Sequence, residues 1–241
     1  MGTVVSIEVR DPGIDAAVVE EVVAYLHDID ARFSPYREDS EVCRLGRGEL
    51  ALDDVSPDLR RVLAMCEDLR VASDGHFDVR GHRGDGRLDP SGLVKGWSID
   101  EAALILDAAG ARDYWINAGG DILVRGEWEP GAAWRVGIRH PGESERLAAV
   151  LEVTDMAVAT SGTYERGDHI RTRDGVAPKG LLSVTVVGPR LTWADAYATT
   201  AFAMGEAGIG WVAARPGYGV YAITTDERAR WSDLVDDLLV R

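Results

Sequence analysis

The sequence is poor in basic residues, cysteine and long apolar runs, and each shortage excludes a class of protein. Its 241 residues include 26 lysines and arginines against 41 aspartates and glutamates, a formal net charge of −15. So acidic a chain is unsuited to broad binding of nucleic acid or anionic membranes, both of which attract basic patches. Any phosphorylated ligand must therefore be held by local devices, such as a metal ion or backbone N–H groups.

Two cysteines, Cys43 and Cys66, are too few for a disulfide framework, and both are expected to be reduced packing residues. No apolar run approaches the roughly 18 residues that a transmembrane helix needs, so no membrane insertion is expected. Residues 1–9 alternate like a strand and lack the basic and apolar regions of a signal peptide. These features predict a cytoplasmic protein.

Several common catalytic motifs are missing as well. The chain contains no Gly-x-x-x-x-Gly-Lys-Ser/Thr loop, no Gly-x-Gly-x-x-Gly turn after a strand, no His-Glu-x-x-His helix and no Gly-x-Ser-x-Gly elbow. None of the five histidines lies at zinc-ligand spacing with a third donor. The chemistry must therefore be sought in less familiar segments.

Hydrophobic periodicity separates a helix-rich first half from a strand-rich second half. Apolar spacing predicts helices within 14–33 and over about 94–109, and Ser56-Pro57-Asp58 is a typical start for another helix. Because the strands come in runs, the pattern favours one α+β domain over residues 1–241, with a largely antiparallel sheet and packed helices. The later elements are expected to be strands at 114–117, 122–125, 134–139, 147–153, 182–187 and 220–224, a helix at 192–204 and an amphipathic segment at 231–240.

Four short segments carry residues suited to binding, although each also has an ordinary structural explanation. Segments 117–121 and 160–164 contain small residues that let a ligand approach the backbone; the alternatives are a hairpin turn and a loop. Asp195 and Thr199 share one helix face and offer oxygen donors suited to Mg²⁺, or Asp195 simply complements the helix dipole. Segment 89–96 brings an acid, a Ser-Gly turn and a lysine to a helix start, where N–H groups favour an anion or a plain cap forms.

Taken in order, these segments resemble the FAD:protein FMN transferase family, also called the ApbE family. The resemblance extends from Met-Gly-Thr at residues 1–3 to the helix at 194–205 and implies an ApbE-like, T-fold-like α+β architecture. The matching motifs are Phe33-Ser34-Pro35-Tyr36 with Ser40-Glu41, Gly75-His76-Phe77-Asp78, Asp89 with Lys95-Gly96 and Asp100, Asn117-Ala118-Gly119-Gly120-Asp121, Thr160-Ser161-Gly162-Thr163-Tyr164, His169, and Ala194-Asp195-Ala196-Tyr197-Ala198-Thr199-Thr200.

The resemblance implies Mg²⁺-dependent transfer of FMN from FAD to a Thr or Ser hydroxyl of a partner protein, with release of AMP. It places Mg²⁺ between the backbone oxygen of Gly92 and the side chains of Asp195 and Thr199. His169 is expected to act as the base for the acceptor hydroxyl, because a neutral imidazole can take a proton near neutral pH. The residues expected at the FAD site are Met1, Tyr36, His76, Phe77, Asp78, Asp89, Lys95, Asn117, Gly119, Asp121 and Arg171.

The chain departs from the family pattern in two places. The family follows its histidine with Ile-Ile-Asp-Pro-x-Thr-Gly, whereas here the residues after His169 are Ile-Arg-Thr-Arg-Asp-Gly. The stretch between Asp78 and Asp89 is also shorter than usual, which implies a more open pocket mouth. The family's acceptor sequence, Asp-x-x-Ser/Thr-Gly-Ala-Thr, is absent, so the chain is expected to modify another protein.

Two other functions stay open at this point. A Mg²⁺-dependent FAD pyrophosphatase would use the same residues, with water replacing the acceptor hydroxyl. A flavin-binding module that kept the fold and lost turnover belongs to a different class, and the missing aspartate and proline leave room for it.

Overall fold

A computed structural model describes residues 3–80, 87–163, 172 and 176–241. Within these residues the main sheet has seven strands in the order β1-β2-β3-β6-β7-β8-β9, and each pair of neighbours is antiparallel. A separate antiparallel hairpin consists of β4 and β5. The strands are β1 Val5–Val9, β2 Tyr114–Ala118, β3 Asp121–Arg125, β4 Trp134–His140, β5 Glu143–Val153, β6 Ala157–Gly162, β7 Leu181–Gly188, β8 Gly219–Thr224 and β9 Ala229–Trp231.

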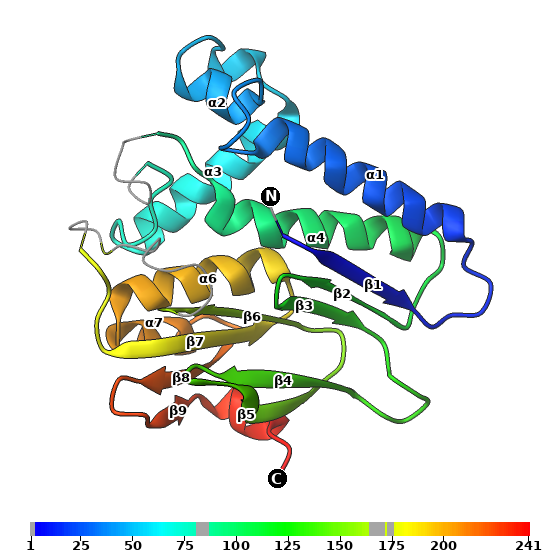
Figure 1. The fold of residues 1–241 in the computed structure, drawn as a ribbon, viewed down its shortest axis with the longest axis vertical. Helices are drawn as coiled ribbons and strands as arrows, with labels where there is room; N and C mark the ends of the chain where they lie inside the picture. The colour runs from blue at the N-terminus through cyan, green and yellow to red at the C-terminus, as the bar shows by residue number, and fades with distance from the viewer. Residues whose placement is uncertain (1–2, 81–86, 164–171, 173–175) are drawn as a thin grey trace.

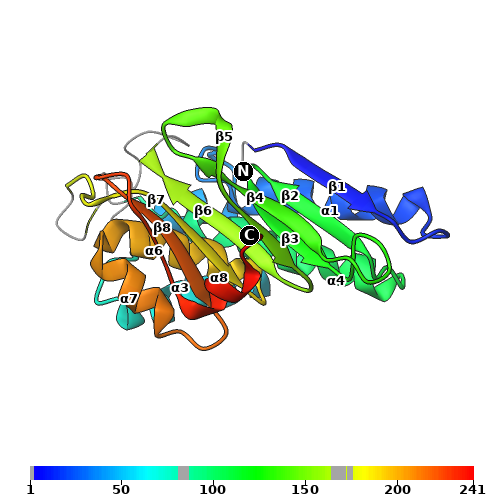
Figure 2. The same cartoon turned by 90° about the horizontal axis from the view of Figure 1, so that it is seen from below.

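The helices lie mainly on one face of the main sheet, and the hairpin covers part of the other face (Figure 1; Figure 2). Helices α4 and α6 pack side by side on the sheet, α1 packs against α4, and α7 packs beside α6 and β8. This arrangement confirms the α+β class and the antiparallel sheet. The helices are α1 Ala16–Phe33, α2 Glu41–Gly46, α3 Pro57–Ala72, α4 Ser91–Ala108, α6 Leu191–Met204, α7 Ala207–Ala213 and α8 Asp233–Leu238, with a short 3-10 turn, η1, at Leu52–Asp54.

Alternating side chains divide the core between the two faces of the sheet. Along β2, Tyr114 and Ile116 point toward the helices and are buried there with Leu123 of β3. On the other face, Val124 packs against the hairpin, where Trp134 is buried. Residues 134–139 alternate between buried and exposed, as the sequence predicted.

Several element boundaries differ from the predicted ones. The first strand begins at Val5 instead of residue 1, helix α4 begins at Ser91, and β5 begins at Glu143. The segment at 231–240 contains only the end of β9 and the short helix α8. The expected loop around residues 160–164 begins inside strand β6, and the sequence pattern did not predict α2 or α7.

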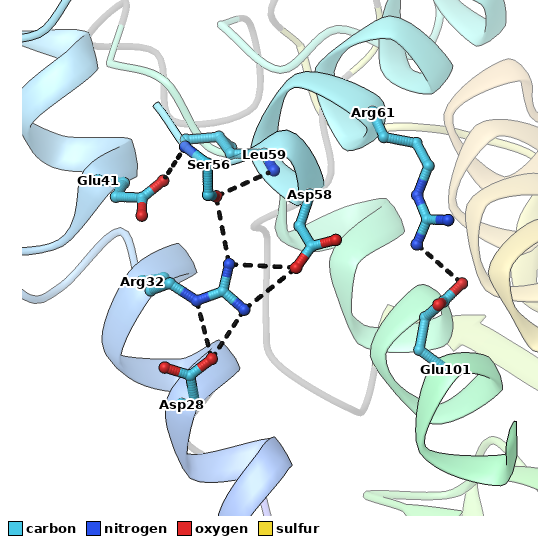
Figure 3. Close-up of polar contacts among 8 residues, drawn as sticks. All are labelled: Asp28, Arg32, Glu41, Ser56, Asp58, Leu59, Arg61 and Glu101. Carbon is cyan, nitrogen blue, oxygen red and sulfur yellow. Dashed lines mark hydrogen bonds and ion pairs between the residues drawn. The ribbon is translucent and has the colours of Figure 1, made fainter. Parts of the chain in front are cut away.

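A network centred on Arg32 joins the outer helices (Figure 3). Its guanidinium donates to Asp28 one turn earlier in α1, and to Ser56 and Asp58 at the start of α3. Ser56 is the predicted cap of α3: its hydroxyl accepts from the Leu59 N–H at 3.3 Å. These contacts fix α1 against the start of α3. From there α3 runs toward the motif at residues 75–78.

Both cysteines are free: Cys66 is buried within α3 and Cys43 is half-buried, as the sequence predicted. Among the residues that the structure describes, no helix combines the length and apolar character needed to cross a lipid bilayer.

Candidate active site

The candidate site forms where α4 and α6 cross on the sheet. Gly96 of α4 lies so close to the first residue of α6 that a Cβ there would overlap the carbonyl oxygen of Leu191. The N-cap residue of α6 supplies no side-chain cap. The carboxylate of Asp100, from α4, accepts instead from the N–H groups of Leu191 at 3.0 Å and Thr192 at 2.9 Å. Because α4 thus caps α6, the two helices are fixed relative to each other.

One turn into α6, Asp195 faces α4. Its Oδ2 accepts from the backbone N–H of Gly96 at 3.1 Å, and its Oδ1 lies 3.4 Å from the Lys95 Nζ. Lys95 Nζ also forms a shorter ion pair with Oδ2 of Asp121, at the start of β3. Two buried carboxylates therefore share one ammonium group, so the cluster has one net negative charge when both carboxylates are ionised.

Burial dominates the electrostatics of this cluster. Loss of water around Asp195 raises the pKa of its carboxyl to about 7, the nearby Asp121 charge adds to the rise, and Lys95 opposes it. A carboxylate in this environment gains from any further cation placed against it. Shifted ionisation in a polar cluster of this kind is typical of functional sites.

Oxygen donors continue along α6 from Asp195. Thr199 is one turn further on, and its Oγ1 lies 3.4 Å from the Ser161 Oγ of β6. The backbone of Gly92 passes the same side chain: a Cβ there would lie 3.6 Å from Thr199 Cγ2 and 3.2 Å from Phe77 Cε2. The absence of a side chain at Gly92 thus lets its backbone lie close to both Thr199 and Phe77.

This donor set fits Mg²⁺. A carboxylate, a hydroxyl and a peptide carbonyl are hard oxygen ligands, and Mg²⁺ takes one or two carboxylates and completes its shell with water or phosphate oxygens. Within the described residues, no group of three or more His, Cys, Asp or Glu side chains is placed to hold a metal. A cation here would therefore take most of its remaining ligands from water or from the bound substrate.

The motifs at residues 75–78 and 89–92 meet at the start of α4. Phe77 is fully buried beside Gly92, and its N–H donates to Ser73 Oγ at 3.0 Å. Asp89 Oδ1 accepts from both the N–H and the hydroxyl of Ser91, the first residue of α4. In this structure Asp89 therefore shapes the turn that starts the helix, and Asp78 likewise accepts from the N–H of Arg80 at 2.8 Å.

The structure does not bring every predicted residue to this cluster. Asn117 lies on the sheet face opposite the helices, and its Oδ1 accepts from the Gly120 N–H at 2.8 Å in the turn between β2 and β3. There it lines a cavity of about 720 Å³ together with Trp115, Trp128 and Trp134. The indole N–H groups of Trp115 and Trp134 already donate to protein oxygens, so they do not identify a ligand for that cavity.

Other predicted residues lie at the edges of the site or outside the described part. Gly119 has a φ of +65°, and its N–H donates to the Val4 carbonyl at 3.1 Å, so it shapes the turn beside β1. Tyr36 is 77% exposed in the turn after α1, and His76 is half-buried. Met1, His169 and Arg171 lie outside the described residues, as does most of the stretch between Asp78 and Asp89.

Two polar residues, Asp100 and Ser161, complete the site through contacts that the sequence pattern did not predict. Asp100 stood within a recognised motif, but its role as the cap of α6 was missed, and so was the contact between Ser161 and Thr199. The sequence did carry a signal for the cap by Asp100. The residue before α6 is Arg190, at a position where a helix usually has a side chain that accepts a hydrogen bond. No local signal exists for the contact between Ser161 and Thr199, which joins residues 38 positions apart.

The fold and the cluster define a class of protein. It is an α+β domain whose site combines a lysine with oxygen donors, and this combination suits a divalent cation and an anionic ligand. A sequence model of the ApbE family matches residues 1–83 and 79–222. The chain therefore belongs to the ApbE family.

Individual relatives agree with this assignment. The FAD:protein FMN transferase of Haemophilus influenzae is 26% identical, with 92% of this chain and 84% of that protein aligned. The enzyme of the same name from Vibrio cholerae is 28% identical, with coverages of 86% and 80%.

Solved structures of the family share the fold. The flavin transferase ApbE from Vibrio cholerae superposes with a TM-score of 0.87 at 24% identity and covers 99% of this chain and 96% of its own. The apo form of the flavinyl transferase ApbE from Pseudomonas stutzeri gives 0.84 at 24% identity, with coverages of 99% and 93%.

Proposed function

We propose that this protein transfers the FMN portion of FAD to a threonine or serine hydroxyl of another protein and releases AMP. The names of the aligned relatives support the reaction, and residues 1–241 are proposed to act as one transferase domain. The observation that carries the proposal is the convergence of Lys95, Asp195 and Thr199 near the backbone of Gly92 at the start of α4. FAD contains a pyrophosphate, and a pyrophosphate bound at these residues needs cationic partners.

The donor is proposed to lie with its pyrophosphate at the start of α4. Lys95 supplies a positive charge there, and the helix N-terminus favours an anion. The side chains of Asp195 and Thr199, with the carbonyl of Gly92, would hold Mg²⁺, which stabilises negative charge on phosphate oxygens when bound. The remaining proposed FAD contacts are Met1, Tyr36, His76, Phe77, Asp78, Asp89, Gly119 and Arg171.

The transfer step itself is a phosphoryl substitution. The acceptor hydroxyl oxygen attacks the phosphorus on the FMN side, a new P–O bond forms, and the bond from that phosphorus to the bridging oxygen breaks. AMP leaves with the bridging oxygen, and the hydroxyl proton passes to a base, for which His169 is proposed. Much of the rate is expected from positioning, because the site must hold the acceptor and phosphorus in line.

The direct test is a transfer assay with purified protein, FAD, Mg²⁺ and an acceptor domain that contains Asp-x-x-Ser/Thr-Gly-Ala-Thr. We expect flavin fluorescence that stays with the denatured acceptor, a mass increase equal to one FMN residue, and one AMP released per flavin attached. An acceptor with its target hydroxyl replaced by alanine is the control. AMP and free FMN released at the same rate with either acceptor would show that the protein is a pyrophosphatase instead.

A further inference from the structure

Asp121 is held in place by the backbone of the sheet. Its Oδ1 accepts from the N–H of Thr160 at 3.0 Å, next to the point where the β3–β6 ladder begins at Ile122 and Val158. The carboxylate therefore takes the place of the next backbone hydrogen bond between β3 and β6. Its side chain is only 2% exposed, so neither its position nor its partners depend on solvent.

Lys95 is bound unequally by the two carboxylates that face it. Its Nζ forms the shorter ion pair with Asp121, whereas Oδ1 of Asp195 lies 3.4 Å away. Oδ2 of Asp195 is already bonded to the Gly96 N–H. Without the pull of Asp121, the ammonium would move toward Asp195 Oδ1, because among the described residues Asp195 is the other carboxylate within ion-pair distance of Lys95.

From this geometry we propose that Asp121 is a positioning residue that keeps the Lys95 ammonium off Asp195, so that Asp195 stays available to a divalent cation. This inference rests on the proposed function, because it assumes that Asp195 and Thr199 hold Mg²⁺. It gives Asp121 a role through Lys95 instead of a direct contact with FAD. The Asp-Lys pair thereby allows a lysine and a metal ion to act in one small site without competing for the same carboxylate.

The test compares Asp121→Asn with the parent protein. Asparagine keeps an oxygen for the Thr160 N–H but loses the charge that holds Lys95. FAD binding is followed by quenching of flavin fluorescence over a range of Mg²⁺ concentrations, and the midpoint of the Mg²⁺ effect is recorded. We expect D121N to raise this midpoint at least about fivefold, the lower end of typical coupling between sites.

Two further variants separate the mechanism from simple loss of charge. Asp107→Asn removes a carboxylate from the same helix as Lys95, about 18 Å further along at 1.5 Å per residue, and should leave the midpoint within about twofold. In a Lys95→Met background, D121N should likewise change the midpoint by less than about twofold, since no ammonium is left to move.

The outcomes are distinct. A D121N midpoint within about twofold of the parent, or an equal effect of D121N with and without Lys95, would overturn the role of Asp121. A parent protein whose FAD binding ignores Mg²⁺ would overturn the metal site in the proposed function and this inference with it. A crystal structure of D121N decides without any FAD titration: Lys95 Nζ should approach Asp195 closer than 3.4 Å, and an unmoved ammonium would refute the proposal.

Discussion

Replacing Gly96 with alanine tests how the site is built, because it adds one methyl group where α4 and α6 touch. The new Cβ would overlap backbone atoms of Leu191, which cannot rotate away as the end of a side chain can. Alanine is favoured over glycine within a helix by about 1 kcal/mol, whereas overpacking costs about 1–3 kcal/mol. Since the obstacle is backbone, we take the upper end and expect a net loss of about 2 kcal/mol in the free energy of unfolding.

The same change should disturb binding. The Gly96 N–H donates to Asp195, and Lys95 is its neighbour, so separating the helices moves the two charged groups that the site depends on. For a chain of this length, a loss of about 2 kcal/mol corresponds to a melting temperature lower by about 4–8 °C. Urea unfolding followed by tryptophan fluorescence measures the stability, and quenching of flavin fluorescence measures FAD affinity.

Two glycines near the end of the chain serve as matched controls. Gly210, within α7, has nothing within 4 Å of an added Cβ, so Gly210→Ala should raise the free energy of unfolding by up to about 1 kcal/mol. Gly208→Ala pushes a methyl group against the backbone of Ala201, and should lose stability without losing FAD affinity. If G96A is as stable as the parent, or loses no more FAD affinity than G208A, the reasoning about the helix crossing is wrong.

Three further predictions concern single side chains. Asp195→Ala and Thr199→Ala should abolish or shift the Mg²⁺ requirement of transfer with an unchanged circular dichroism spectrum; a D195A protein with the parent's rate and Mg²⁺ dependence would exclude that ligand. His169→Ala should keep FAD affinity and lose about 10²–10⁴-fold in single-turnover transfer, and a rate within about twofold of the parent would leave the base unidentified. Burial raises the pKa of the Cys66 thiol, so a thiol reagent should label only the half-buried Cys43 in the native protein and both cysteines in denaturant; rapid labelling of Cys66 in the native state would contradict its burial.

The elements that the sequence predicted well are those with local, periodic signals. Helix α1 has one buried stripe and solvent on its other side, so its apolar residues recur at helical spacing. Strand β4 has one buried face, so its side chains alternate. Ser56 followed by proline marks the start of α3 because both residues act within the first turn.

Strand β6 was missed because it lies in the middle of the sheet with both faces covered. Nearly all of its side chains are buried, so the sequence shows no alternation between polar and apolar residues. Its small residues, Ala-Val-Ala-Thr-Ser-Gly, were therefore interpreted as leading into a loop. The packing of α6 against this strand explains why small residues suit it, and that contact joins segments distant in the sequence.

The chemistry of the site could be predicted more fully than its geometry. The offset of four between Asp195 and Thr199 placed both on one helix face, but the partnership with Lys95 spans 100 residues and depends on the helix crossing. That Asn117 and Asp121 face opposite sides of the sheet could, however, be predicted from the sequence. Ala118 pairs with Asp121 across the hairpin, so the residue before Ala118 must face the other side of the sheet.

The cluster of Lys95, Asp121 and Asp195 explains how so acidic a chain could bind its proposed substrate, which is itself an anion. With both carboxylates ionised, the cluster carries one net negative charge, which repels a pyrophosphate. A bound divalent cation favours the ionised form of Asp195 and makes the net charge of the cluster positive by one. At an effective dielectric constant of 20, two unit charges 4 Å apart interact by about 4 kcal/mol, so this change of sign outweighs most single contacts. An anion unable to share the cation would lose this attraction and face a chain with a net charge of −15, so the site would select ligands that bind the metal as well as the protein.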